Sequence, residues 1–156
     1  MAMALQTQWA STRVRRSVCV LRFIPARDAS AWAGRVDAHI AKMADGSGGR
    51  YLTEDIFAAI YEGQFQLWTI TRGDDLLAVV VTAVETYPRA RELRVIGLSG
   101  RQWRVWGGLI ADLERAAREH FGCTKIAAMH IPKLHHILPG YQTTHWLSEK
   151  DLTCAA

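Results

Sequence analysis

Three stretches with the period of a β-strand follow one another between residues 64 and 99. The first two, QFQLWTI and LLAVVVTAVETY, are joined by TRGDD, and PRAR at 88–91 leads into the third, ELRVIGLS. Connections this short join antiparallel neighbours, because a parallel connection needs about a dozen residues or more. The sequence therefore predicts an antiparallel meander, which fixes the centre of the fold.

A helix and a further strand are predicted after the meander. One face of the helix carries apolar residues at helical spacing and the other is charged; the apolar positions are Trp103, Trp106, Ile110, Leu113 and Ala117. Gly122 is expected to end this helix, and TKIAAMH at 124–130 has the pattern of a strand. A helix between two strands favours a right-handed parallel crossover.

A strand and a helix are predicted before the meander. SVCVLRF at 17–23 alternates like a strand, and Pro25 ends it. The following residues repeat apolar side chains at helical spacing, so they predict a helix with Asp28 or Ser30 as its N-cap.

A second, shorter helix follows the glycine-rich loop DGSGGR at 45–50. Thr53 is predicted to cap it, with acidic residues in the first turn, and Gly63 to stop it. A last strand is expected around residues 143–147, after two proline-bounded turns.

The chain of 156 residues is long enough for one domain with its own core. We expect a single domain over residues 17–156 with a mixed α/β (α+β) fold. A central sheet would hold the antiparallel meander and one parallel crossover, flanked by helices. Residues 1–16 are expected to be a flexible basic segment, because the first fifty residues hold eight Arg or Lys against three Asp.

No stretch approaches the roughly 18 apolar residues that a membrane span needs, and the N-terminus lacks the regions of a secretory signal. We therefore expect a cytoplasmic protein with no membrane partner. Three widely spaced cysteines argue against a disulfide framework and for reduced, partly buried thiols. A surface strand or the tryptophan-rich helix face could pair with a second copy, so a homo-oligomer stays open.

Four longer stretches carry a family resemblance: EGQFQLWTI, TAVETYPRARELRVIGLSG, LIADLERAAREHFGCTKI and ILPGYQTTHWLSEKDL. Together with the element order, they resemble the GNAT (Gcn5-related N-acetyltransferase) fold over nearly the whole chain after residue 17. The QLW strand, the YP turn, the GC after the long helix and the LPGY near the end are similar to those of small GNAT-like proteins of bacteriophages and prophages. This resemblance implies an acetyltransferase or a virion protein, with phage structural proteins among its partners.

The resemblance implies an acetyl-CoA site in the turn between the third meander strand and the long helix. Catalytic members of the family hold the pyrophosphate there in a Q/R-x-x-G-x-G/A turn, where helix N–H groups favour an anion and glycine allows close approach. The corresponding turn of this chain spans residues 100–108. Arg104 and Gly107 match the pattern, but Leu109 stands where the family has a second small residue, so the turn is degenerate.

The expected cofactor-binding residues are Gly100, Arg101, Arg104, Gly107 and Gly108. The glycines, together with Gly97, would end the strand and shape the turn, and the arginines would neutralise phosphate charge. Trp103 and Trp106 are bulky residues in the turn where the family keeps small ones. They are equally well explained as aromatic anchors that fix the helix onto the sheet.

Acetyl transfer to an amine needs a base for the attacking ammonium and an acid for the departing thiolate. Glu85, near the end of a meander strand, is the candidate base, and Glu92 is the alternative; either is also explained as a solvated charge. The family's usual acid is a tyrosine in the short helix after the last parallel strand. This chain has His135 and His136 there, which leaves Tyr141, at what resembles a packing position, as the candidate acid.

Four histidines within sixteen residues raise the hypothesis of a metal site; they are His130, His135, His136 and His145. Their spacing does not favour one, because adjacent histidines point to different sides of almost any regular element and no tight pair with a third ligand is present. We therefore predict no metal.

Three functions remain open from the sequence. The first is an acyltransferase that moves an acetyl group from acetyl-CoA to an amine that the sequence does not identify. The second is a GNAT-like virion structural or assembly protein without cofactor, consistent with the degenerate turn. The third is a nucleic-acid-binding protein that uses Arg13, Arg15 and Arg16.

Overall fold

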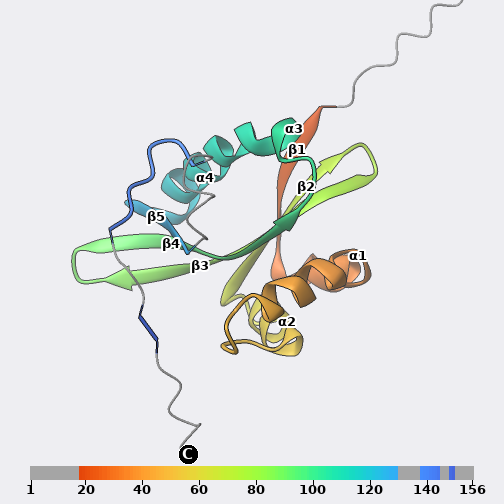
Figure 1. Ribbon diagram of the computed structural model, residues 1–156, viewed down its shortest axis with the longest axis horizontal. Helices are drawn as coiled ribbons and strands as arrows, with labels where there is room; N and C mark the ends of the chain where they lie inside the picture. Colours follow the sequence, from red (N-terminus) through yellow and green to blue (C-terminus); the bar gives the residue numbers. More distant parts are fainter. Residues whose placement is uncertain (1–17, 130–137, 145–147, 150–156) are drawn as a thin grey trace, which may run out of the picture.

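The computed structural model describes residues 18–129, 138–144 and 148–149 (Figure 1). The elements in chain order are β1 (Cys19–Ile24), α1 (Ala26–Asp45), α2 (Thr53–Tyr61), β2 (Phe65–Arg72), β3 (Asp75–Tyr87), β4 (Ala90–Gly100), α3 (Trp103–Trp106), the 3-10 turn η1 (Gly107–Leu109), α4 (Ile110–Phe121) and β5 (Lys125–Ala128).

The described strands form one five-stranded sheet in the order β1-β2-β3-β4-β5. Strands β1 to β4 pair antiparallel, each with its neighbour in the sequence, and β4 pairs parallel with β5. The helical segment between β4 and β5 is the connection that this parallel pair requires. The predicted meander, the parallel pair and the α/β fold class are confirmed.

Strand β3 is the centre of the molecule, because its residues 77–83 are buried on both faces. Val79 and Val81 belong to the core formed with α1 and α2, whereas Val80 packs with Leu113 and Ala117 of α4. Figure 1 shows α1 and α2 on one side of the sheet and α4 on the other. A strand covered on both faces has a continuous apolar sequence, and LLAVVV is such a run.

The predicted N-cap of the first helix is wrong. Helix α1 begins directly after Pro25, and neither Asp28 nor Ser30 caps it. Proline has a φ of −58° here, which is already the value that a helix start needs, and its carbonyl accepts the N–H of Asp28 at 2.9 Å. Asp28 instead lies in the first turn, where its charge favours the helix dipole.

The second helix is also capped differently from the prediction. Thr53 is its first helical residue, and Leu52 precedes it with extended backbone. The N–H of Leu52 donates to the carboxylate of Asp55 at 2.8 Å. The carboxylate of Asp55, within the first turn, therefore accepts the backbone N–H that precedes the helix. The Thr53 hydroxyl does not serve as the cap.

The single long helix predicted from Trp103 is broken into α3, η1 and α4. Gln102, just before α3, has left-handed backbone with φ 59°. Two consecutive glycines, Gly107 and Gly108, follow α3, and glycine is a poor helix former. The segment before Ile110 is therefore a compact turn and not the first turns of a regular helix.

Two other expectations fall partly outside the described residues. Residues 143 and 144, where the last predicted strand would begin, are not in a strand, and residues 145–147 lie outside the description. Cys19 is half-buried and Cys123 is buried, both as free thiols, as predicted. Cys154 and residues 1–16 are not described.

No helix in the described part of the chain has the length and apolarity to cross a membrane.

Replacing Gly100 by alanine is expected to destabilise the fold. A Cβ at this position would lie 2.4 Å from the Cβ of Ala78 and 2.9 Å from the carbonyl oxygen of Leu77, both on β3. Because these are rigid atoms of the central strand, β4 must shift, at a cost of about 1–3 kcal/mol of the free energy of unfolding.

Urea unfolding of Gly100→Ala, read from its midpoint and slope, measures this cost. The matched control is Gly34→Ala in α1, where a Cβ meets no atom within 4 Å. This control is expected to gain roughly 0.5–1 kcal/mol from helix propensity. Equal stability of the two variants would contradict the assigned contact between β3 and β4.

Candidate functional site

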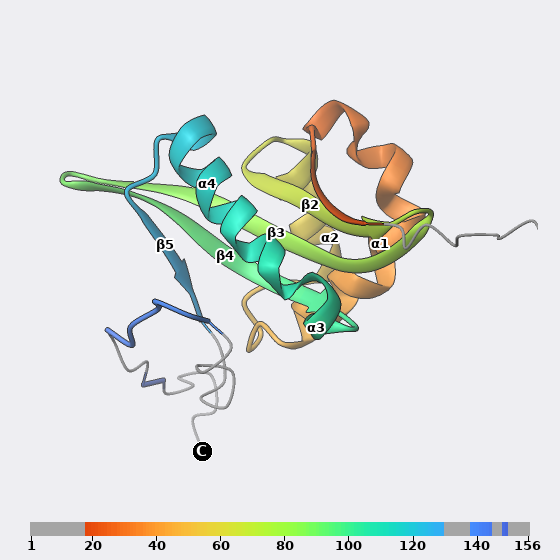
Figure 2. The ribbon, with the colours of Figure 1, turned by 90° about the horizontal axis from the view of Figure 1, so that it is seen from above.

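Strand β4 continues beyond the end of its pairing with β5. The parallel ladder runs from Glu92↔Lys125 to Val95↔Ala128, while β4 extends to Gly100. Figure 2 shows β4 running on past the end of β5. In the described part of the chain, no strand pairs with this edge of β4 over residues 96–100. Residues 130–137, which follow β5 in the sequence, lie outside the described part of the chain.

A β-bulge lies in β4 directly after its last described pair with β5. Val81 of β3 pairs with Gly97 and the next residue, Thr82, pairs with Val95, so Ile96 is the extra residue of β4. A bulge bends its strand and increases the local twist, so β4 is bent at this position.

The turn after β4 is fixed by contacts to the core. The N–H of Arg101 donates to the carbonyl of Leu77 at 2.9 Å, and the indole N–H of Trp106 donates to the carbonyl of Arg101 at 2.6 Å. Trp106 is 2 % exposed and packs with Ile70, Leu77 and Ala78. Trp106 therefore anchors the turn to the sheet, as the sequence suggested.

The glycines of the turn have different surroundings. A Cβ on Gly107 would lie 2.9 Å from the indole of Trp103, so the tryptophan requires a glycine there. A Cβ on Gly108 would meet no atom within 4 Å, and Gly108 is exposed. Of these two, only Gly108 leaves open space beside the backbone for a ligand.

The two arginines of the turn are also unequal. The guanidinium of Arg101 lies 2.5 Å from the carboxylate of Asp75 at the start of β3. Arg104 is exposed and has no ion-pair partner among the described residues. Arg104 is therefore the cation of this turn whose charge is available to an anion.

The candidate bases lie together, far from the turn. Glu85 and Glu92 face each other across β3 and β4, and Arg94 contacts both, at 4.0 Å and 3.3 Å. The guanidinium of Arg94 also donates to the hydroxyl of Tyr87 at 2.6 Å. Glu92 is eight residues from Gly100 along β4, or about 26 Å at the rise of a strand. The structure brings the two carboxylates together but separates them from the glycine turn.

Tyr141, the candidate acid, lies against α4. Burial and the neighbouring carboxylate of Glu114 raise the pKa of its hydroxyl above the ordinary value for tyrosine. The phenol therefore stays protonated at neutral pH and holds its proton tightly. His130, His135, His136 and His145, which raised the question of a metal, lie outside the described residues.

A pair beside the turn was missed from the sequence. Nδ1 of His39, on α1, lies 2.9 Å from the hydroxyl of Ser99, the residue before Gly100. Burial, and then the charges of Lys42 and Arg101, lower the pKa of His39, while its hydrogen bond to Ser99 opposes this shift. Sixty residues separate the partners, and no motif in either segment announces the contact.

Comparisons with known proteins identify the fold. No protein-family model and no curated protein sequence matches the chain. The structure is similar to the ribosomal-protein-alanine N-acetyltransferase of Brucella melitensis, with 16% sequence identity, a TM-score of 0.62, and coverage of 86% of this chain and 98% of that chain. It is also similar to a GNAT family acetyltransferase of Staphylococcus aureus, with 13% identity, a TM-score of 0.60, and coverage of 86% and 99%.

A third similar structure contains the cofactor. It is a predicted acetyltransferase of Clostridium acetobutylicum with acetyl-CoA, with 15% identity, a TM-score of 0.57, and coverage of 85% of this chain and 96% of that chain. Identities this low show the fold and leave the activity open. The chain has the GNAT fold, as its sequence resemblance predicted.

The acid sensitivity of the protein is expected to depend on His39. Because its pKa is below 6.5 in the folded state, the unfolded chain binds this proton more readily. The contribution of His39 to the free energy of unfolding is therefore fully present above pH 6.5 and is lost as the pH falls below it. The variant His39→Gln should lose less stability on acidification, since glutamine does not titrate.

Urea unfolding of both proteins above and below pH 6.5 measures the difference. His120→Gln, which removes an exposed histidine of α4, is the control and should keep the acid sensitivity of the original chain. Identical acid sensitivity of the original chain and His39→Gln would contradict the role given to His39.

Proposed function

We propose, on the premise of the GNAT fold, that this protein transfers an acetyl group from acetyl-CoA to an amine. The observation that carries the proposal is the course of β4, which outruns its pairing with β5 and leads through a glycine turn into a helix. Among the described residues, this arrangement offers a strand edge without a partner strand beside a helix start, and a helix start favours a phosphate group. The similar structure with acetyl-CoA has the same fold.

The residues of the turn fit the cofactor in part. Gly108, with open space at its Cβ position, would let the pyrophosphate approach the backbone, and Arg104 would neutralise its charge. Gly100, Arg101 and Gly107 already contact β3, Asp75 and Trp103, so we assign them to the shape of the turn. The bound cofactor would supply an activated acetyl thioester.

The proton transfers are assigned to the residues that the sequence indicated. Glu85, or Glu92 beside it, would take the proton that the attacking amine loses as its nitrogen bonds to the acetyl carbon. Tyr141 would give its proton to the thiolate that leaves. Because the carboxylates lie about 26 Å from Gly100, the acceptor would have to enter near the start of β4 and not near the turn. The amine itself is not identified.

A second candidate, a GNAT-fold protein without catalysis, is favoured by specific contacts. Trp103 fills the space beside Gly107, and Asp75 already pairs with Arg101, so two features of a phosphate turn serve packing instead. The phage-like motifs of the sequence make a virion structural or assembly role the form that we propose for this candidate. Nucleic-acid binding by Arg13, Arg15 and Arg16 is a weaker proposal and concerns residues outside the description.

Titration calorimetry of the purified chain with acetyl-CoA decides between the two candidates. The acyltransferase proposal expects saturable binding that Arg104→Ala weakens about fivefold to thirtyfold, since a charge-assisted contact to phosphate contributes roughly 1–2 kcal/mol. Arg118→Ala, which removes an exposed arginine of α4, should bind like the original chain.

Turnover is tested separately, with a panel of amines and detection of free thiol. Glu85→Gln is expected to lower turnover at least tenfold while leaving acetyl-CoA binding unchanged, because general-base catalysis contributes roughly a hundredfold or more. No binding at millimolar acetyl-CoA would reject the enzyme and leave the non-catalytic candidate. Equal turnover of Glu85→Gln and the original chain would reject Glu85 as the base.

A further inference from the structure

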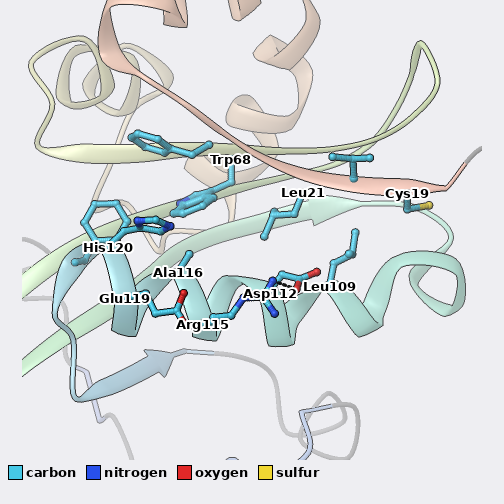
Figure 3. A pocket seen from close by; sticks show the side chains of 12 residues that line it. Cys19, Leu21, Trp68, Leu109, Asp112, Arg115, Ala116, Glu119 and His120 are labelled. Atoms are coloured by element: carbon cyan, nitrogen blue, oxygen red, sulfur yellow. Dashed lines mark hydrogen bonds and ion pairs between the residues drawn. The ribbon is translucent and has the colours of Figure 1, made fainter.

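A groove of about 650 Å³ runs between β1 and α4, on the face of the sheet that α4 covers (Figure 3). This volume is that of a small-molecule site, which typically measures roughly 300–1,000 Å³. Strand β1 lies three strand spacings from β4, or about 14 Å. The β1 wall of the groove is therefore separate from the edge of β4.

The floor of one end of the groove is aromatic. The ring of Phe23 lies 5.1 Å from that of Trp68 and 6.0 Å from that of Phe121, measured between centroids, and the last two lie 6.1 Å apart. The indole N–H of Trp68 is already donated to Thr82 at 2.9 Å, so this ring presents no free polar group. Phe23 is 41% exposed although it belongs to this cluster. Trp68 is 4% exposed, so the ring surface that is open to a ligand is mainly that of Phe23.

The α4 wall of the groove is charged. Asp112 and Arg115 form an ion pair at 2.5 Å and neutralise each other. Glu119, one turn beyond Arg115, has no ion pair or hydrogen bond with any other described residue. In Figure 3 these three side chains follow α4 and face Leu21 and Trp68 across the groove. The groove therefore combines an apolar floor with one uncompensated negative charge.

We propose that this groove binds a small organic cation with an apolar body, such as an aliphatic or aromatic amine. The apolar body would lie against Phe23 and Trp68, and the ammonium would meet Glu119. Aromatic faces attract cations as well as apolar groups, so both parts of the ligand are favoured at this end. His120 also lines the groove, beside Trp68 in Figure 3, and Arg115, the one arginine or lysine among the lining residues, is already paired with Asp112. An anion of the same size would therefore face the charge of Glu119 without an unpaired arginine or lysine in the lining. The proposal does not depend on acetyl transfer.

The test uses three compounds of one shape: phenylbutylamine, phenylbutanol and phenylbutyrate. Each is titrated into the ¹⁵N-labelled full chain while the amide and indole N–H signals are followed by NMR. The amine is expected to bind saturably, with a Kd in the millimolar range, and to shift signals of Trp68, Glu119 and Phe121. The alcohol should bind more weakly and the acid not measurably.

Two variants separate the charge from the apolar floor. Glu119→Gln is expected to weaken the amine roughly threefold to tenfold and leave the alcohol unchanged, because only the amine is charged. Phe23→Ala should weaken both compounds. Glu54→Gln, which removes an exposed carboxylate of α2, is the matched control and should bind like the original chain. Thermal unfolding of every variant verifies that it is folded.

Four results would overturn the proposal. The first is the absence of saturable binding of the amine, and the second is equal binding of amine and acid, which would leave only a hydrophobic surface. The third is amine binding that Glu119→Gln does not change. The fourth is amine binding that appears only after removal of residues 1–16, or only on dilution from a dimer seen in sedimentation. That result would make the occupant a segment of this chain or a second copy.

Discussion

The packing of β4 against the central strand β3 determines where every candidate site lies. Gly100 approaches Ala78 more closely than any side chain would permit, and the next residue, Arg101, donates its N–H to Leu77. These contacts set the position at which β4 ends and the chain turns toward the helix. Because β3 is itself buried by helices on both faces, neither strand can move without disturbing both layers. The turn is thus positioned by its contacts with the core.

The same turn shows how packing and binding compete for one segment. The ring centroids of Trp103 and Trp106 lie 4.6 Å apart. Trp103 occupies the space beside Gly107 that a cofactor phosphate would otherwise approach. Leu109, at the position of the family's second small residue, packs on the cluster around Trp106. The side chains by which this turn departs from the family's pattern are therefore the ones that pack it against the core. The anion binding that we propose for it would rest on Gly108, Arg104 and the helix dipole.

The sequence predicts what is determined locally. Strand and helix periods depend on neighbouring residues, so the element order, the meander and the stop at Gly122 follow from spacing alone. The predicted helix starts were wrong because the prediction assumed Ser, Thr or Asp at the N-cap position. The structure instead begins α1 after Pro25 and caps α2 with the side chain of Asp55. The break of the long helix had a signal in the sequence, the consecutive glycines Gly107 and Gly108, because glycine is a poor helix former.

The candidate site was less predictable, since its groups meet only in the folded chain. The residue types of Glu85 and Glu92 suggested a base, but their shared contact with Arg94 and their distance from Gly100 depend on the register of β3 and β4. His39 and Ser99 come from segments sixty residues apart. The groove between β1 and α4 likewise joins distant parts of the chain.

The 3-10 turn η1 connects the two ligand surfaces that we propose. Gly108 leaves open space at the start of α4, while the next residue, Leu109, lines the groove beside β1. Adjacent residues of a single tight turn therefore belong to a phosphate site and to a site for an organic cation. The proposed amine would lie toward the other end of the groove, at Phe23 and Glu119, and Glu119 is ten residues from Leu109, or about 15 Å at the rise of a helix. Coupling between the two proposed sites would therefore require a ligand long enough to reach Leu109.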